Sequence, residues 1–191
     1  MRVACGDMRD LVKTILDLPK AFGGRLIITM IDHDELVVGR MVLIMTILLL
    51  EDIDASSAVD CALHVWYSAF LTDKHLSLLC TKVKPLLKSW IANPGAHAPF
   101  VQTGLCGNRL LLAVTPKLLE RLVVRLDARL DYGKAIASRL SIVMARPDML
   151  DATMFDYRTR LHRRCSILHF KGTGVLLPYG TDVTGFKNPN P

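Results

Sequence analysis

The stretch from Arg2 to Asp34 constrains the fold more than any other part of the sequence. Its first apolar run, Val3 to Cys5, is short and ends at Gly6, where the missing Cβ lets the chain turn sharply. Asp7 suits the N-cap of a helix, because its carboxylate can accept the first free backbone N–H groups. Apolar residues at helical spacing follow, and Pro19 ends the pattern. The chain therefore opens with a predicted strand, a glycine turn and a helix.

A second predicted strand spans Leu26 to Ile31, which is apolar apart from Thr29, a pattern typical of a strand covered on both faces. A strand, a helix and a strand in this order favour a right-handed crossover and a parallel pair. Ligands of parallel sheets bind beyond the carboxyl ends of the strands, which here means Gly6–Asp7 and Asp32–His33–Asp34. We therefore predict an α/β fold that starts as a parallel sheet in the order strand, helix, strand, helix.

The next apolar stretch, Leu36 to Leu50, is 15 residues long, with Arg40 inside it and Glu51–Asp52 directly behind it. A helix needs roughly 18 to 20 apolar residues to span a membrane, so this one is too short. Its apolar residues point in all directions, which indicates packing on more than one side. We predict that it is the second crossover helix, buried in the protein, and we expect no membrane contact.

The remainder of the chain is predicted to be a large helical portion that ends in a hairpin. Helices are expected at residues 55–71, from Thr72 through Leu87, from Thr115–Pro116 through Leu130, at 134–145 and at 148–165. Strands are expected at 100–103 and 109–114. Two apolar runs separated by glycines, Ile167 to Phe170 and Val175 to Leu177, predict the C-terminal hairpin.

Two details of this helical portion follow from residue chemistry. Pro85 should kink the helix that contains it or divide it in two. The helix predicted at residues 55–71 carries a stripe of residues at helical spacing, which predicts an aromatic core face. The members of this stripe are Val59, Ala62, Leu63, Trp66 and Phe70.

The composition fits one globular domain over residues 1–191 with an irregular tail at 181–191. The chain has 51% hydrophobic and 22% charged residues, enough apolar side chains for a well-filled core. Five widely spaced cysteines do not form a disulfide framework, which favours a reducing, intracellular compartment. We expect the cytoplasm rather than the nucleus. The first apolar run is broken at once by Gly6 and Asp7, so no secretory signal peptide is predicted.

Three segments carry a resemblance to a known family: ACGDMRDLVKT, LIITMIDHDELVVGR and LHVWYSAF. They resemble a fungal family of unknown function whose members often occur in longer proteins with a MYND-type zinc finger. The family is related to axonemal dynein assembly factors, and its fold resembles class I S-adenosylmethionine methyltransferases. The resemblance covers about residues 2–70 and is thinner afterwards, although GVLLPYG (174–180) is also similar. Family members usually have residues ahead of the first strand, which implies a shortened relative or a fragment.

The methyltransferase resemblance implies a site for S-adenosylmethionine. Gly6 would let the backbone approach this cofactor, and Asp32 or Asp34 would bind its ribose hydroxyls. The chain departs from the pattern because it has one glycine where the cofactor loop usually has several, and because no third strand is visible before residue 100. The residues by themselves support another interpretation, in which Gly6 is a turn glycine and the acidic loop caps the following helix. No catalytic residue can be assigned.

A metal site is not predicted. Cys61 with His64 and His162 with Cys165 are each three residues apart, but no CxxC occurs, and a structural zinc normally needs four ligands in two tight pairs. Buried thiols and incidental histidines explain these residues better.

Basic residues gather in the second half of the chain. Between Glu120 and Lys171 there are 11 Lys and Arg against 6 Asp and Glu. The candidate patch for an anion or a partner consists of Arg121, Arg125, Arg129, Arg158, Arg160, Arg163 and Arg164. Such a patch can bind an acidic protein, a phosphorylated segment or RNA. No nucleic-acid motif accompanies it, so a solvated face or a protein contact is the default interpretation.

Two hypotheses about function remain open. The first is a non-catalytic protein-interaction or assembly module on a degenerate methyltransferase-like fold, working without a cofactor. The second is an S-adenosylmethionine-dependent methyltransferase with a divergent cofactor loop and an unknown substrate, since methyl transfer can rely largely on positioning. The loss of glycines, the missing third strand and the related assembly factors favour the first.

Overall fold

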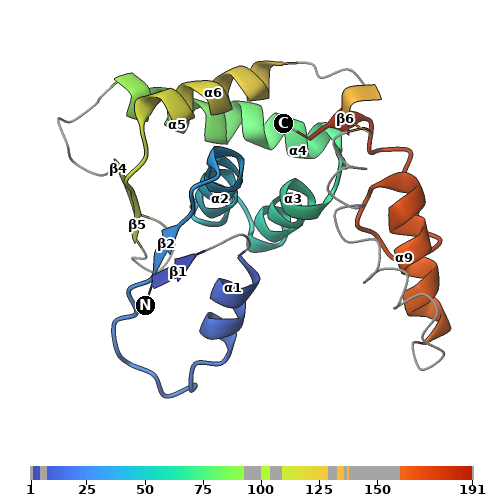
Figure 1. The fold of residues 1–191 in the computed structure, drawn as a ribbon, viewed down its shortest axis with the longest axis horizontal. Coiled ribbons are helices and arrows are strands. Elements are labelled where there is room, and N and C mark those ends of the chain that lie inside the picture. Colours follow the sequence, from blue (N-terminus) through green and yellow to red (C-terminus); the bar gives the residue numbers. More distant parts are fainter. Residues whose placement is uncertain are drawn as a thin grey trace.

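The computed structural model describes residues 2–4, 8–92, 100–103, 109–128, 133–135, 137 and 160–190. In this part the protein is mostly helical, with three separate two-stranded sheets. Figure 1 shows a central helical layer, a small sheet unit with the N-terminus on one side, and a lone helix at the opposite edge. Most of the predicted helices at 134–145 and 148–165 lies outside the described residues, and residues 161–165 belong to the lone helix.

The N-terminal unit has the predicted order of elements: β1 (Arg2–Ala4), α1 (Arg9–Leu16), β2 (Thr29–Ile31) and α2 (Glu35–Leu48). The strands β1 and β2 run parallel, with Val3 opposite Met30, which confirms the predicted pairing. Among the described residues no third strand joins this pair. The structure therefore contains a strand–helix–strand–helix start but does not show a Rossmann-like parallel sheet.

The prediction that the second strand is covered on both faces is wrong. Only three of its six predicted residues form β2, and the exposed fractions are 62% for Ile27 and 55% for Ile31. Parallel strands are normally buried because neighbouring strands and crossover helices cover them. No further strand pairs with β2 in the described part, and Ile27 and Ile31 remain open to solvent.

The core is built around α2, which confirms the prediction of a buried helix. Met41 to Ile44, Thr46 and Ile47 are buried, and the helix packs against α3 (Ala55–Tyr67) and α6 (Pro116–Asp127). Asp34 begins α2 as its N-cap, accepting the backbone N–H of Leu36 on its carboxylate at 2.8 Å. No helix in the described part of the chain is long and apolar enough to cross a membrane.

The predicted core face of α3 is partly wrong. Ala62 is buried and Trp66 packs against the core as predicted, but the side chains of Val59 and Leu63 are exposed. The buried residues of α3 are Ala58, Cys61, Ala62, His64 and Val65. Small residues on the buried face let the α2 backbone approach closely, and the larger apolar residues point elsewhere. Phe70, the last member of the predicted stripe, is buried but lies beyond the helix, in β3 (Phe70–Leu71).

Pro85 divides its helix, as predicted. The segment begins with α4 (Asp73–Leu78), continues through a π-helical turn (Leu79–Val83) and ends with α5 (Lys84–Ala92). Proline has no N–H to donate to the carbonyl four residues earlier, and its ring crowds that carbonyl. The wider π-helical turn just before Pro85 accommodates both effects.

The strands β4 (Phe100–Thr103) and β5 (Arg109–Leu112) form the predicted antiparallel pair. Leu110 and Leu112 are buried while Arg109 and Leu111 are exposed, the alternation of a strand with one face on the core. Thr115 then caps α6 by accepting the N–H of Leu118, and Pro116 takes the first helical position, both as predicted.

The predicted C-terminal hairpin is wrong. Ile167 to Phe170 lie inside the helix α9 (Leu161–Thr173), and Val175 to Leu177 form no strand. A short apolar run does not distinguish a strand from a helix, and Gly174, with φ of 74°, is the left-handed residue that ends the helix. The only strand in the predicted irregular tail, within the described residues, is β6 (Asn188–Pro189), which pairs antiparallel with β3.

Gly39 sets the approach of α2 to α6, and its replacement tests this contact. A Cβ at Gly39 would lie 2.9 Å from Cδ2 of the buried Leu122. We expect Gly39→Val to lower the free energy of unfolding in urea by about 1–3 kcal/mol, the usual cost of overpacking.

The control for this variant is Gly172→Val in α9, where a Cβ would meet nothing within 4 Å. This control should leave stability nearly unchanged. Equal effects of the two substitutions would contradict the close packing of α2 on α6.

Candidate functional site

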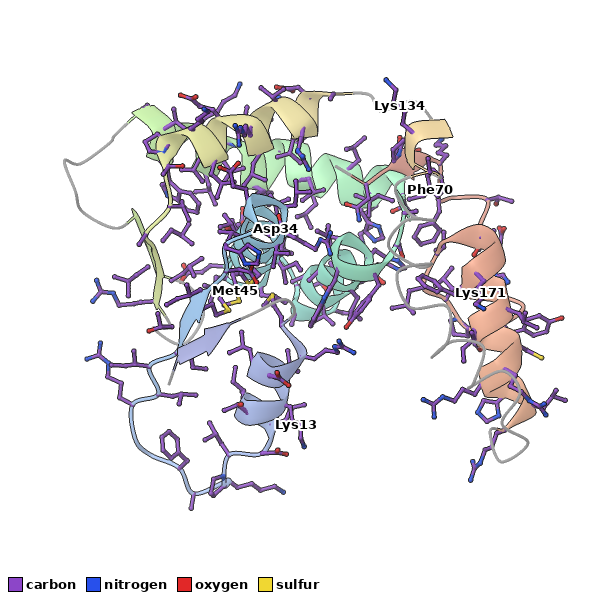
Figure 2. All side chains as sticks on the ribbon, viewed as in Figure 1. Lys13, Asp34, Met45, Phe70, Lys134 and Lys171 are labelled. Atoms are coloured by element: carbon purple, nitrogen blue, oxygen red, sulfur yellow. The ribbon has the colours of Figure 1, made fainter. Side chains whose placement is uncertain are left out.

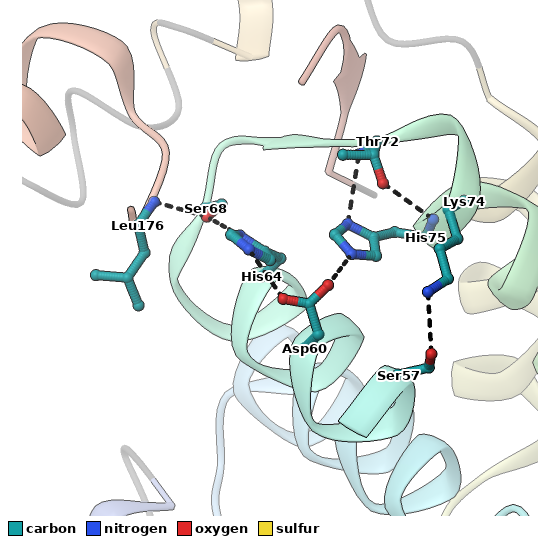
Figure 3. Close-up of polar contacts among 8 residues, drawn as sticks. All are labelled: Ser57, Asp60, His64, Ser68, Thr72, Lys74, His75 and Leu176. Carbon is teal, nitrogen blue, oxygen red and sulfur yellow. Dashed lines mark hydrogen bonds and ion pairs between the residues drawn. The ribbon is translucent and has the colours of Figure 1, made fainter. Parts of the chain in front are cut away.

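Polar side chains concentrate where α3 ends and α4 begins. Of the four buried polar residues in the described part, His64, Ser68 and His75 lie here, and each histidine is 4% exposed. Figure 3 shows how Asp60, one turn before His64 on α3, faces both imidazoles. Burying three polar side chains together is costly unless each has hydrogen-bond partners, so their arrangement determines what this site can do.

Asp60 joins the two histidines. Its Oδ2 lies 2.8 Å from Nε2 of His75, and its Oδ1 lies 3.6 Å from Nε2 of His64. The two imidazoles stack with ring centroids 5.0 Å apart. The Asp60 side chain is itself 55% exposed, so the carboxylate receives both rings from the buried side while it remains in contact with water.

Backbone groups hold both rings in place. Thr72 donates its N–H to Nδ1 of His75 at 3.4 Å, which places the hydrogen of this ring on Nε2, facing Asp60. Leu176 donates its N–H to Oγ of Ser68, and this hydroxyl forms a hydrogen bond with Nδ1 of His64 at 2.8 Å. Burial is the main cause that lowers the pKa of His64, His75 contributes, and Asp60 opposes the shift.

The order Ser68, His64, Asp60 superficially matches a catalytic triad, but the geometry does not support nucleophilic catalysis. The Ser68 hydroxyl is buried and already accepts the Leu176 N–H. Burial raises the pKa of the neighbouring Cys61 thiol to about 12, so this thiol is not a nucleophile either. Three side chains suited to hold a metal ion do not gather anywhere in the described ranges.

What the cluster does is hold the C-terminal segment of the chain. The Phe186 ring packs against both imidazoles, with centroids 4.7 Å from His64 and 5.9 Å from His75. Two residues further on, β6 pairs with β3, so that Leu71 is opposite Asn188 and Phe70 is opposite Pro189.

Asn190 completes the end of α3. Its side-chain amide donates to the carbonyl oxygens of His64, Val65 and Ser68 at 3.2, 3.0 and 2.7 Å, and its backbone N–H donates to Ala69 at 2.9 Å. The last carbonyls of a helix have no partner within the helix. One asparagine amide therefore supplies donors that α3 lacks.

Asp73 binds the same segment from the start of α4. It receives the Lys187 ammonium at 2.8 Å and the Asn188 side-chain amide at 2.8 Å. The hydrogen bond from Lys187, followed by that from Asn188, holds the pKa of Asp73 below its usual value.

The predicted cofactor residues lie elsewhere, at the carboxyl end of β2. Asp34 is the N-cap of α2, which confirms the helix-cap interpretation for this residue. Oδ1 of Asp32 accepts the backbone N–H of Asp34 at 3.0 Å, and its side chain is 9% exposed. Gly6 lies outside the described residues. Ribose binding by Asp32 or Asp34 stays a prediction.

The predicted basic patch is divided between two helices. On α6, Arg121 pairs with Glu35 of α2 and Arg125 is exposed. Arg160 and Arg163, at the start of α9, are exposed. Arg164 is partly buried, and its Nε has no hydrogen-bond partner among the residues that the structure describes. The two remaining members, Arg129 and Arg158, lie outside the described residues.

Sequence reasoning missed the histidine cluster. It considered His64 only beside Cys61, as a weak metal pair, whereas the partners that matter are Asp60 four residues before it and His75 on another helix. The one local signal for the place of His75 was the start of α4. There the Thr72 side chain accepts the backbone N–H of His75, and the His75 side chain accepts the backbone N–H of Thr72, which is a capping box. The role of Asn190 had no signal in the sequence.

Comparisons with known proteins give a match over the first part of the chain and no activity. Residues 1–71 match the model of a domain of unknown function, DUF4470. This range runs from β1 to β3 and contains the three segments whose resemblance pointed to a family of unknown function. Neither curated proteins nor solved structures gave a match.

Substitution of Asn190 tests its role at the end of α3. Asn190→Ala leaves the α3 carbonyls without these donors and should lower stability by about 1–3 kcal/mol. Asn190→Asp should cost at least as much, because a carboxylate cannot donate and repels the carbonyl oxygens. Urea unfolding measures both changes. Lys20→Ala, at an exposed residue in the loop after α1, should leave stability nearly unchanged and serves as the comparison.

The lowered pKa of His64 predicts a pH dependence of stability. The unfolded chain binds a proton near pH 6.5, the ordinary value, while the folded protein resists it. The contribution of the unprotonated His64 to the free energy of unfolding is therefore complete above this pH. It is lost as the pH falls toward the lowered pKa of His64 in the folded protein. His64→Asn should flatten the stability profile between about pH 5 and 7, whereas the same change at His33, whose side chain is fully exposed, should not.

Proposed function

We propose that this chain is a non-catalytic protein-interaction module built on the start of a Rossmann-like, methyltransferase-like sheet. The observation that carries the proposal is the apolar surface around α1 and β2, here called the N-terminal patch. It accounts for half of the exposed large apolar residues in the described part of the chain. Its members are Val12, Ile15, Leu16, Phe22, Leu26, Ile27, Ile31 and Leu36.

The N-terminal patch arises because α1 has more apolar surface than its neighbours cover. Met8 and Leu11 are buried, but Ile15 is 49% exposed and Leu16 is 76% exposed. Figure 2 shows side chains of α1 and of the loop after it projecting away from the central helices. Contiguous apolar surface of this kind typically marks a site of protein contact.

The sheet beside the patch supports the same proposal. A parallel pair normally lies inside a larger sheet with helices on both faces, whereas β1 and β2 pair only with each other in the described part. A partner protein that covers α1 and the open side of β2 would bury Ile27 and Ile31. The partner supplies the cover that the rest of a complete methyltransferase-like domain would supply.

A second function, S-adenosylmethionine-dependent methyl transfer, has one specific observation in its favour. Asp32 directly follows β2 of a parallel pair, the position at which an acidic residue binds the ribose in dinucleotide-binding folds. Against it, Asp34 is engaged in capping α2, and Oδ1 of Asp32 is engaged by the Asp34 backbone.

Charge placed in the N-terminal patch tests the interaction function. We expect the double variant Leu16→Asp, Ile27→Asp to weaken partner binding at least about 100-fold, because burying each side chain contributes roughly 1.5–3 kcal/mol. Partners captured on the wild-type chain are identified by mass spectrometry, and their affinities are then measured with purified components.

The matched control places the same charges at Val124 on α6 and Leu168 on α9, which are comparably exposed. This control should bind as the wild type does. Equal loss in both double variants, or none in either, would count against the N-terminal patch.

A thermal-shift titration separates the two functions. The interaction module gives a flat response to S-adenosylmethionine and S-adenosylhomocysteine up to millimolar concentration. A methyltransferase would gain about 2.7 kcal/mol at 100 times the dissociation constant. A gain that disappears in Asp32→Ala and persists in the exposed control Asp17→Ala would establish cofactor binding and overturn the module.

A further inference from the structure

We propose that the surface formed by the end of α3, β3 and the start of α4 is a peptide-binding groove that this chain fills with its own residues Phe186–Asn190. The partner that fits it is an extended protein segment with the same chemistry: an aromatic residue, then lysine, asparagine, any residue and asparagine. This C-terminal groove is separate from the N-terminal patch, and the inference does not rest on the function proposed for that patch.

The groove recognises an aromatic side chain at its first position. His64 and His75 present stacked rings, and the Phe186 ring lies against both at a tilt of 53° to the first and 57° to the second. Aromatic groups in such tilted contact attract each other beyond the effect of the area they bury. The hydrogen bonds to Asp60, Ser68 and Thr72 hold the two imidazoles in place for this contact.

The last position of the segment is recognised by backbone carbonyls. Three carbonyl oxygens at the end of α3 converge on the Asn190 amide, the shortest contact being 2.7 Å, from Ser68. A side chain must be a donor, short and without a negative charge to satisfy them. Asparagine meets all three conditions, and the negative end of the helix dipole excludes aspartate.

The middle positions of the segment, residues 187–189, are recognised by Asp73 and by main-chain pairing. Asp73 binds the lysine and the first asparagine of the segment, and the Asn188 amide also donates to the Leu71 carbonyl at 3.3 Å. The backbone adds a short strand to β3. In a recurring mode of peptide recognition, the main-chain hydrogen bonds of an added strand provide affinity and the side-chain contacts provide specificity.

The segment occupies the groove without being part of the core. None of residues 186–190 is buried. Phe186 packs against a small cluster of Phe70, Ala135 and Val175, apart from the main core around α2. Its pairing with β3 is two residues long. Segments with few buried contacts open at low free energy, so an outside segment can exchange with this one.

Exchange has a measurable consequence. The chain's own segment competes with any partner, so the apparent affinity for an outside segment is reduced by the fraction of time the groove is filled. Weakening the internal segment should therefore tighten binding of an external one, the opposite of what damage to a binding surface does.

The experiment uses a fluorescein-labelled peptide of residues 182–191 and the full chain, with binding followed by fluorescence anisotropy. We expect the chain variant Phe186→Ala, Asn190→Ala to bind the peptide at least about 10-fold more tightly than the wild-type chain. The milder chain variant Lys187→Ala should give a smaller gain in the same direction. Circular dichroism confirms that each variant is folded.

Two controls locate the binding. The peptide carrying the same two alanines should not bind any chain. Adding Asp73→Asn, an exposed change on the groove side, to the double variant should reverse most of its gain.

Other outcomes overturn the proposal. If the folded double variant binds the peptide no better than wild type does, residues 186–190 are a fixed part of the fold. If the full chain instead forms dimers with rising concentration, detected by light scattering, and excess peptide dissociates them, the groove is an exchange site between copies and not a site for a partner.

Discussion

The structure depends on the burial of α2. Its apolar residues point in every direction, so the helix is stable only when other elements surround it. The helices α3 and α6 pack on it through small residues and leucines, and Gly39 lets α6 approach. Caps at Asp34, Asp54 and Thr115 fix where these three helices begin. The helix α5 packs in turn against α6.

The two ends of the chain attach to the central helical layer in different ways. At the N-terminal end, α1 and the pair β1–β2 have more apolar surface than the central layer covers, and the excess faces solvent. At the C-terminal end the excess is polar: α3 ends in carbonyls and buried histidines that need partners, and residues 186–190 provide them. The apolar surface at the N-terminal end is left without cover, whereas the polar groups at the C-terminal end receive partners from the chain itself.

The match to a domain of unknown function ends at residue 71, within β3. The C-terminal groove crosses that boundary, because His64 and Ser68 lie inside the matched range while His75 and Asn190 lie beyond it. The matched segment therefore does not form the groove alone. Its α3 is completed by residues from the far end of the chain, which ties the two halves into one structure.

The sequence determined what depends on near neighbours. The caps at Asp34 and Thr72, the break before Pro85 and the parallel start follow from steric and hydrogen-bonding rules over a few residues. Tertiary structure decided the rest. Which face of α3 is buried depended on where α2 and α4 lie. The segment from Ile167 to Phe170 became part of α9, because that helix runs from its N-cap Arg160 to its C-cap Gly174. The contact of Asn190 with α3 spans more than 120 residues, and no local pattern encodes a hydrogen bond whose two partners meet only after the chain has folded.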